Sequence, residues 1–340
     1  MALLERRRAT TSVAVALSLI FCAVAAAAML TTPDVAAAPM PATPEAEPAD
    51  FSRAALDRRA PIVAERSYRL KAGVRLLLFW VRRDNVGYGR LTWRASGEDH
   101  RVLEFLVGSD PERAPRHVNR WGFIAEEAGP SGADLLGIMS KSDEESVDDA
   151  KATTEAAGES GSHPYRGIRT AIRGGIASGG VFRFVSTKPL TYRDLDTVLS
   201  TIHSDVDVPR TVRVPNGTRP GFLFAVEDLI VSTLDQCRAG LKSAPAPLPY
   251  VYNNTFYTLR LLDCDFDPHR AVGGREFSNV IRSQLETRNI ATGNRTSFRL
   301  EYGAAGDLKA VPMRIVFRPK WWFEAELLLD DQAGADAARQ

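Results

Sequence analysis

Hydrophobic and polar positions alternate most clearly in residues 73–108, GVRLLLFWVRRDNVGYGRLTWRASGEDHRVLEFLVG. An apolar run at 74–81 is followed by turn residues at 84–87. In the next run Leu91 and Trp93 alternate with polar residues, and a third run follows a further turn. A period of two is the pattern of a half-buried strand. The segment therefore predicts a three-stranded antiparallel meander, which we expect to begin the fold.

The segment after this meander, GSDPERAPRHVNRWGFIAEEAG, contains two prolines that stop strand pairing. We expect a connecting loop in which Trp121 and Phe123 close one end of the core. The alternative is a loop that closes over a ligand, with Arg116, His117 and Arg120 as contacts for an anion. We favour the first interpretation.

Helical spacing is clearest in residues 222–238, FLFAVEDLIVSTLDQCR, followed by a stop at Ala239-Gly240. Its apolar stripe is broad enough to pack against a sheet. Residues 191–202 predict a second helix, and residues 51–65 a short third one.

Extended chain is predicted in two further regions. Gly174-Gly175 and Gly179-Gly180 each mark a turn or a bulge, and a strand follows at 181–185. After a proline-rich linker at 243–249, five extended runs end the chain, with a hairpin at 305–307. These runs are residues 250–266, 275–290, 296–303, 310–318 and 321–330.

These elements predict a mainly β protein of the β-rich α+β class. We expect a curved antiparallel sheet or half-barrel with one prominent packed helix, 222–238. Residues 140–163 hold seven acidic residues and no aromatic one, so we expect a disordered insertion. The predicted parts are a signal peptide or anchor (1–30), a linker with the short helix (31–65), an N-terminal β-meander part (66–139), the acidic insertion (140–163), a C-terminal β-rich part of the same domain (164–330) and a loose tail (331–340).

The N-terminus has the layout of an export signal. Arg6-Arg7-Arg8 precedes an uncharged apolar run from Ser12 to Leu30, and small residues follow it. The competing interpretation is an uncleaved membrane anchor formed by residues 12–30, because the run is nearly long enough to span a bilayer. Both interpretations place the rest of the chain outside the cytoplasm, in the periplasm or beyond.

Export changes the interpretation of the cysteines. Beyond Cys22 in the apolar run, the chain has two, Cys237 and Cys264. A pair in an oxidising compartment favours a disulfide, and two buried free thiols are the alternative.

Charge and motifs exclude several function classes. A net charge of +1 argues against a nucleic-acid partner. The sequence has no Gly-x-Ser-x-Gly, no His-x-x-x-His and no phosphate-binding glycine loop. We therefore predict no catalytic residues and no cofactor, and we favour a protein that is not an enzyme.

One phrase has the spacing of metal ligands. Asp263, Asp265 and Asp267 fall at every second position, which would place three carboxylates on one side of an extended segment. The phrase departs from a calcium loop because Pro268 stands where glycine is required and Gly274 where the bidentate glutamate is required. We expect the polar end of a strand and no metal site.

Three phrases in residues 228–329 carry a resemblance: DLIVSTLDQCR, PYVYNNTFYTLRLL and AVPMRIVFRPKWWFEAELLL. This third of the chain resembles a family of bacterial exported, β-rich envelope proteins of unknown function. Similar architecture occurs in periplasmic lipid-carrier proteins, in which a curved sheet wraps a helix or an apolar ligand. The acidic insertion and the segment after the meander depart from that pattern, and the resemblance assigns no functional residue.

Our first hypothesis is a non-enzymatic envelope protein that binds an apolar ligand, such as a lipid, or a partner protein. Apolar runs such as LLLFWV exceed what one face of a sheet needs, which motivates it. The alternatives are a hydrolase of envelope polymers that uses paired carboxylates, and a structural assembly protein. We expect membrane contact through the N-terminal segment if it is not cleaved.

Overall fold

The computed structural model describes residues 60–76, 79–97, 99–114, 119–140, 161–202, 206, 209–241, 243–320 and 323–330. The predicted signal or anchor, the linker up to residue 59, residues 141–160 of the acidic segment and the tail lie outside these residues.

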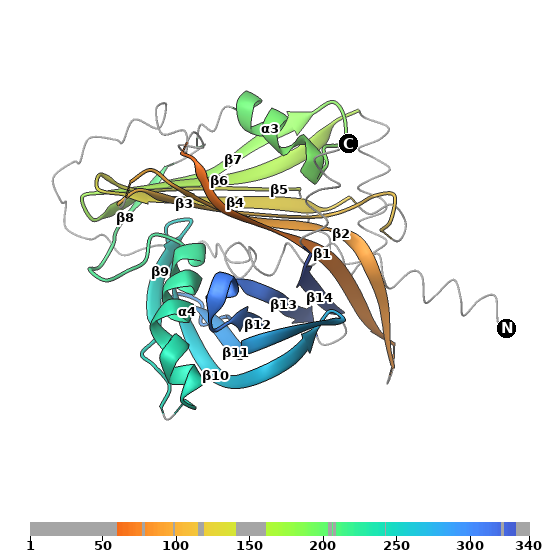
Figure 1. Cartoon of the computed structure of the whole chain (residues 1–340). Coiled ribbons are helices and arrows are strands. Elements are labelled where there is room, and N and C mark those ends of the chain that lie inside the picture. The colour runs from red at the N-terminus through yellow and green to blue at the C-terminus, as the bar shows by residue number, and fades with distance from the viewer. Residues whose placement is uncertain are drawn as a thin grey trace.

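In the described residues, fourteen antiparallel strands form one sheet that is not closed, in the order β8-β7-β6-β5-β4-β3-β2-β1-β14-β13-β12-β11-β10-β9 (Figure 1). The prediction of a mainly β, antiparallel protein is confirmed. The strands are β1 Ile62–Leu76, β2 Phe79–Ala95, β3 Arg101–Ser109, β4 Trp121–Gly129, β5 Gly132–Ser140, β6 His163–Arg173, β7 Ile176–Ser186, β8 Arg210–Arg213, β9 Leu248–Tyr252, β10 Thr255–Val272, β11 Arg275–Asn289, β12 Arg295–Gly303, β13 Pro312–Lys320 and β14 Phe323–Leu329.

The sheet consists of two meanders that meet where the first and last strands pair. Strands β1 to β8 pair with one another in chain order, and so do strands β9 to β14. β1 then pairs with β14, in a register that sets Tyr68 opposite Leu329 and Ala72 opposite Ala325. The two ends of the described chain therefore lie side by side in the middle of the sheet.

Two helices accompany the sheet, α3 Leu195–Thr201 and α4 Phe222–Arg238. The bounds of α4 are those predicted from its apolar spacing. Two short 3-10 turns, η2 Tyr192–Asp194 and η3 Gly306–Leu308, complete the helical structure among these residues. None of the helices in the described part of the chain is long and apolar enough to cross a membrane.

Helix α4 packs on strands β9, β10 and β11 of the second meander, which Figure 1 shows as a strongly curved sheet. Its Ala225, Leu229 and Leu234 are buried in a cluster with Leu259 and Leu300 of the sheet. A second buried cluster contains Tyr68, Leu106, Trp121 and Phe182 of the first meander together with side chains of α3.

The outer edges of the two meanders are tied together by side-chain and loop contacts. The side-chain amide of Asn254, in the turn between β9 and β10, donates to the carbonyl oxygens of Gly179 at 2.7 Å and Arg210 at 2.8 Å, which lie in β7 and β8. Arg219, just before α4, forms a parallel bridge with Tyr250 of β9. These contacts hold α4 and both edges of the sheet in one arrangement.

The predicted first strand of the meander is wrong at its boundaries. The apolar run 74–81 contains the end of β1 and the start of β2, and Leu76 pairs with Phe79 across the hairpin. The predicted turn at 84–87 lies within β2, where Asn85 takes a φ of 55°. Residues 62–65, predicted in the short helix, belong to β1.

The predicted loop around Trp121 is also wrong in part. Trp121 and Phe123 are buried, as expected, but they begin strand β4, and β4 pairs with β5 in a hairpin that the sequence did not predict. The Trp121 indole N–H donates to the Leu190 carbonyl oxygen at 2.9 Å. Arg120 donates to the neighbouring Asn119 carbonyl oxygen, and Arg116 and His117 lie outside the described residues.

The C-terminal third contains six strands rather than five. The predicted run 250–266 is divided by a turn at Asn253 and Asn254, which take φ angles of 48° and 53°. Gly179 is in a strand and not in a turn. A Cβ added there would lie 2.0 Å from the Arg169 carbonyl oxygen of β6, so only glycine permits that approach.

Candidate functional site

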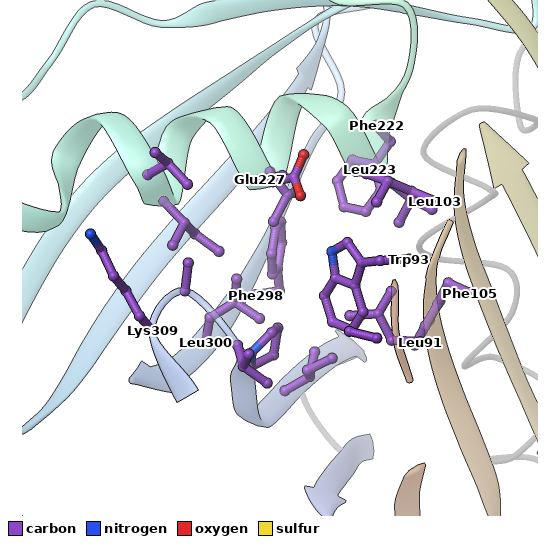
Figure 2. Close-up of a pocket in the computed structure, with 18 of the residues that line it drawn as sticks. Leu91, Trp93, Leu103, Phe105, Phe222, Leu223, Glu227, Phe298, Leu300 and Lys309 are labelled. Atoms are coloured by element: carbon purple, nitrogen blue, oxygen red, sulfur yellow. The ribbon is translucent and has the colours of Figure 1, made fainter. Parts of the chain in front are cut away.

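An apolar cavity of about 330 Å³ lies beside α4. One wall comes from β1, β2 and β3, another from β12 and β13, and α4 forms the third (Figure 2). Its volume lies at the lower end of the ~300–1,000 Å³ that is usual for ligand pockets. Glu227 and Lys309 are its charged lining residues. The apolar ones are Val63, Ala64, Leu91, Trp93, Leu103, Phe105, Phe222, Leu223, Val226, Ile230, Val231, Phe298, Leu300, Ala310, Val311, Pro312, Ile315 and Phe317.

The alternation in β2 and β3 supplies the first wall. Leu91 is opposite Phe105 and Trp93 is opposite Leu103, so all four side chains lie on one face of the strand pair. The sequence predicted a half-buried strand here. Burial follows the opposite pattern: Leu91, Trp93 and Phe105 are only partly buried, because the face that they form lines an open cavity instead of a packed core, whereas Thr92 on the other face is 1% exposed.

Helix α4 has two apolar faces with different surroundings. Ala225, Leu229 and Leu234 pack into the second meander, whereas Leu223 and Val226 line the cavity. This division explains why its apolar stripe is broad.

A buried glutamate of β4 holds the N-terminal end of α4. The Glu126 carboxylate accepts the backbone N–H of Leu223 at 2.9 Å and that of Phe224 at 3.0 Å, two donors without partners inside the helix. Gly221 allows this approach, because a Cβ there would lie 2.1 Å from Glu126 Cδ. Burial raises the pKa of Glu126 to about 7 against these hydrogen bonds, and the nearby Glu227 adds to the rise.

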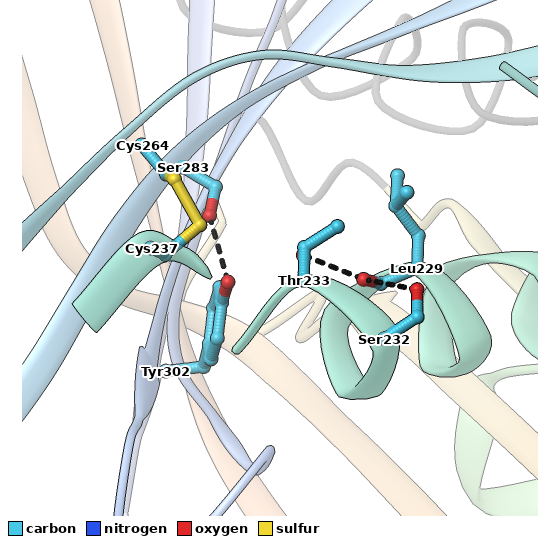
Figure 3. The surroundings of a disulfide bond; sticks show 7 residues. All are labelled: Leu229, Ser232, Thr233, Cys237, Cys264, Ser283 and Tyr302. Carbon is cyan, nitrogen blue, oxygen red and sulfur yellow. Dashed lines mark hydrogen bonds between the residues drawn. A yellow bond between two sulfur atoms is a disulfide. The ribbon is translucent and has the colours of Figure 1, made fainter. Parts of the chain in front are cut away.

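The C-terminal end of α4 is joined to the sheet through sulfur. The structure links Cys237 in its last turn to Cys264 of β10, with the two Cα atoms 5.7 Å apart (Figure 3). Beside the bond, Ser283 Oγ and Tyr302 Oη are hydrogen-bonded at 3.1 Å. The bond itself stays a prediction for thiol chemistry to test.

The two charged lining residues differ in their partners. Glu227 accepts a hydrogen bond from Arg101 Nη1 at 2.9 Å, and the Trp93 side chain also hydrogen-bonds it. Burial raises the pKa of Glu227 even so, because Arg101 opposes the rise without cancelling it. Lys309 is exposed, and it forms no ion pair with the residues that the structure describes.

The buried carboxylates of the last strands lie on the face opposite to the cavity. Glu301 accepts hydrogen bonds from Arg270 at 2.9 and 3.0 Å and from Arg314 at 3.0 Å. Arg314 also pairs with Glu326 at 2.6 Å, and Glu324 pairs with Arg318. Within the described lining of the cavity, Glu227 is the single carboxylate, whereas hydrolysis by a carboxylate pair needs two.

The aspartates with metal-like spacing lie in β10. Asp265 pairs with Arg282 at 2.7 Å and Asp267 with Arg270 at 3.6 Å, so both carboxylates face arginines of the sheet. No group of three metal-ligating side chains occurs in the part of the chain that the structure describes.

The sequence predicted neither the role of Glu126 nor the meeting of the cavity walls. Glu126 lies in a strand that was predicted as a loop, beside a second glutamate that pairs with His100. One feature of the sequence could have indicated Glu126: two adjacent glutamates end the apolar run WGFIA. A charged side chain on a buried face needs a hydrogen-bonding or oppositely charged partner.

No protein-family model matches the chain, and no curated protein matches it. A solved structure that resembles it in part is a presumed lipoprotein from Parabacteroides distasonis, with a TM-score of 0.26 and 10% sequence identity over 78% of this chain and 94% of that chain. A score this low does not establish a shared fold, so the likeness carries no argument about function.

Proposed function

We propose that this chain is an exported protein of the bacterial envelope that binds an apolar ligand, without catalysis, in the cavity beside α4. The observation that carries the proposal is the cavity, whose walls are apolar side chains from three separate parts of the chain. An open hollow of this kind is costly to leave filled with water, because its walls offer few hydrogen-bond partners. An apolar ligand would displace that water and contact the apolar walls.

Two features of the chain support export. The N-terminal pattern of three arginines followed by an apolar run is that of an export signal or anchor. A disulfide between Cys237 and Cys264 fits an oxidising compartment. Cell fractionation with intact-mass measurement of the mature protein tests this part, since cytoplasmic protein that keeps residue 1 would contradict it.

A small apolar ligand explains the site better than a partner protein does. Stable protein interfaces bury about 800 Å² on each partner over an open surface. The apolar side chains beside α4 instead enclose a concavity of ligand size.

Lipid extraction and mass spectrometry of protein purified from the envelope test the proposal. We expect a co-purifying lipid that Val226→Trp and Ile315→Trp deplete, because both place an indole in the cavity from opposite walls. Gln236→Trp is the control, since Gln236 is an exposed residue of the same helix that does not line the cavity. Equal lipid in all three folded variants, or none in the wild type together with no binding of added lipid, would refute the proposal.

A further inference from the structure

We propose that the ligand is a single-chain amphiphile with an anionic head group, and that Lys309 holds this head group at one end of the cavity. This inference rests on the proposed function and names the chemical class of its ligand. It depends on the positions of the two charged lining residues and on how each is partnered.

Lys309 lies at one end of the cavity, away from Glu227 and from the aromatic wall. Figure 2 shows Lys309 on one side of the hollow and Trp93, Leu91 and Phe105 on the other, with Phe298 and Leu300 between them. An amphiphile whose chain contacts Phe105 would therefore present its head group near Lys309.

The exposed lining residues mark the mouth of the cavity, and Lys309 is one of them. Val63 is 68% exposed and Val231 is 57% exposed, and both belong to the lining, as does the exposed Lys309. Exposed apolar side chains beside an exposed amine suit the junction between an acyl chain and its head group.

Charge decides the sign of the head group. The Glu227 carboxylate is already engaged by Arg101 and Trp93, so this group does not favour a cationic ligand. Arg219 similarly engages the neighbouring Asp228. The amine of Lys309 has no carboxylate of the described residues within ion-pair distance, and its charge complements a carboxylate or a phosphate.

Isothermal titration calorimetry below the critical micelle concentration tests the inference with four ligands of one chain length. These are dodecanoate, dodecyl phosphate, dodecanol and dodecyltrimethylammonium. We expect both anions to bind about two- to fivefold more tightly than dodecanol, the range of an exposed ion pair, and the difference to shrink as salt is added. The cation should bind most weakly. The carboxylate and phosphate arms distinguish a fatty acid from a single-chain phospholipid.

Variants assign the preference to one side chain. Lys309→Gln should abolish the gap between dodecanoate and dodecanol while leaving dodecanol affinity unchanged, and Lys309→Arg should keep it. Lys188→Gln, a change at an exposed lysine outside the cavity, is the matched control. Lengthening the acyl chain should raise affinity about fourfold per methylene until the cavity is full.

The outcomes distinguish a wrong head-group charge from a wrong proposed function. Dodecanol that binds as tightly as the anions, a preference for the cation, or a gap that survives Lys309→Gln would overturn the anionic assignment and leave the proposed function intact. Failure of all four ligands to bind the wild-type protein would overturn the proposed function itself.

Discussion

Glu126 makes the stability of this protein depend on pH in a direction opposite to that of most carboxylates. It is 1% exposed, and burial raises its pKa from an ordinary value of 4.5 to about 7. Glu227 faces it as a further negative charge, and the phenols of Tyr250 and Tyr252 are also close enough to interact with it. The groups that favour its ionised form are the backbone N–H groups at the start of α4.

The sign follows from which state binds the proton more tightly. Below pH 4.5 the carboxyl is protonated in both the folded and the unfolded chain. Between pH 4.5 and about 7 the unfolded chain releases the proton and the folded chain retains it, so the free energy of unfolding falls as pH rises. Above pH 7 both states are ionised and the loss is complete. At about 1.4 kcal/mol per pKa unit, the difference between 4.5 and about 7 corresponds to about 3 kcal/mol.

Glu126→Gln removes this titration while keeping the size of the side chain. We expect the wild type to exceed the variant in free energy of unfolding by about 1–3 kcal/mol at pH 4.5, because the hydroxyl oxygen of the protonated carboxyl can still accept from a backbone donor of α4 and the amide NH₂ cannot. That advantage should decline by about 3 kcal/mol by pH 8, so that the two free energies of unfolding become similar or the variant becomes the more stable protein.

Urea unfolding followed by circular dichroism at half-unit steps from pH 4.5 to 8.5 measures the difference. Glu276→Gln serves as the control, since Glu276 is an exposed glutamate of β11 and its removal should leave the curve parallel to that of the wild type. If the wild-type and Glu126→Gln curves stay parallel within about 0.5 kcal/mol, or diverge in favour of the wild type as pH rises, the reasoning about Glu126 is refuted.

Three further predictions concern the packing around α4 and the sheet. Gly221→Ala should lower the free energy of unfolding by about 1–3 kcal/mol, because the added methyl would meet the Glu126 carboxylate; urea unfolding measures it, and an unchanged midpoint would contradict the close approach. Replacing Cys237 and Cys264 by alanine should cost about 3.5 kcal/mol for a loop of 27 residues, and reduction should reveal two additional thiols in unfolded protein; no increase on reduction would exclude the bond. Glu301→Gln should cost about 1–3 kcal/mol, because the amide accepts fewer of the hydrogen bonds from Arg270 and Arg314, although each arginine keeps a second carboxylate, and a melting temperature equal to that of the wild type would show that these ion pairs contribute little.

The sequence predicted the elements whose pattern is local. Helix α4 was placed at its observed bounds, because its apolar spacing and its glycine stop lie within the helix itself. The alternation of Leu91 and Trp93 correctly indicated a strand with one apolar face.

Boundaries failed where a hairpin turn interrupts an apolar run. The β1–β2 hairpin falls inside LLLFWV, and its position is set by the pairing of β1 with both β2 and β14, which is a long-range constraint. The β9–β10 turn was signalled by Asn253-Asn254, since asparagine tolerates a positive φ better than most residues. The predicted run 250–266 nevertheless kept that pair inside a single strand.

The cavity could not be predicted from the sequence, because segments far apart in the chain form its walls. Its walls come from β2 and β3, from α4 and from β12 and β13, segments that approach one another because β1 pairs with β14. No local pattern shows that Trp93 and Phe298 line the same space. The hypothesis of an apolar ligand was motivated by the run LLLFWV, whereas the cavity is lined by the strands and helix around it.

The two ends of α4 are held by different chemistry, and this difference bears on the cavity because the helix is one of its walls. The predicted disulfide of Cys237 with Cys264 would fix the C-terminal end covalently to β10, whereas the Glu126 carboxylate of β4 holds the N-terminal end through two hydrogen bonds from the helix backbone. Phe222 and Leu223, which line the cavity, lie at the end that is held without a covalent bond. A change at Glu126 or Gly221 should therefore alter ligand affinity more than a change at the disulfide of equal cost in stability, since it displaces the part of the helix that forms the wall.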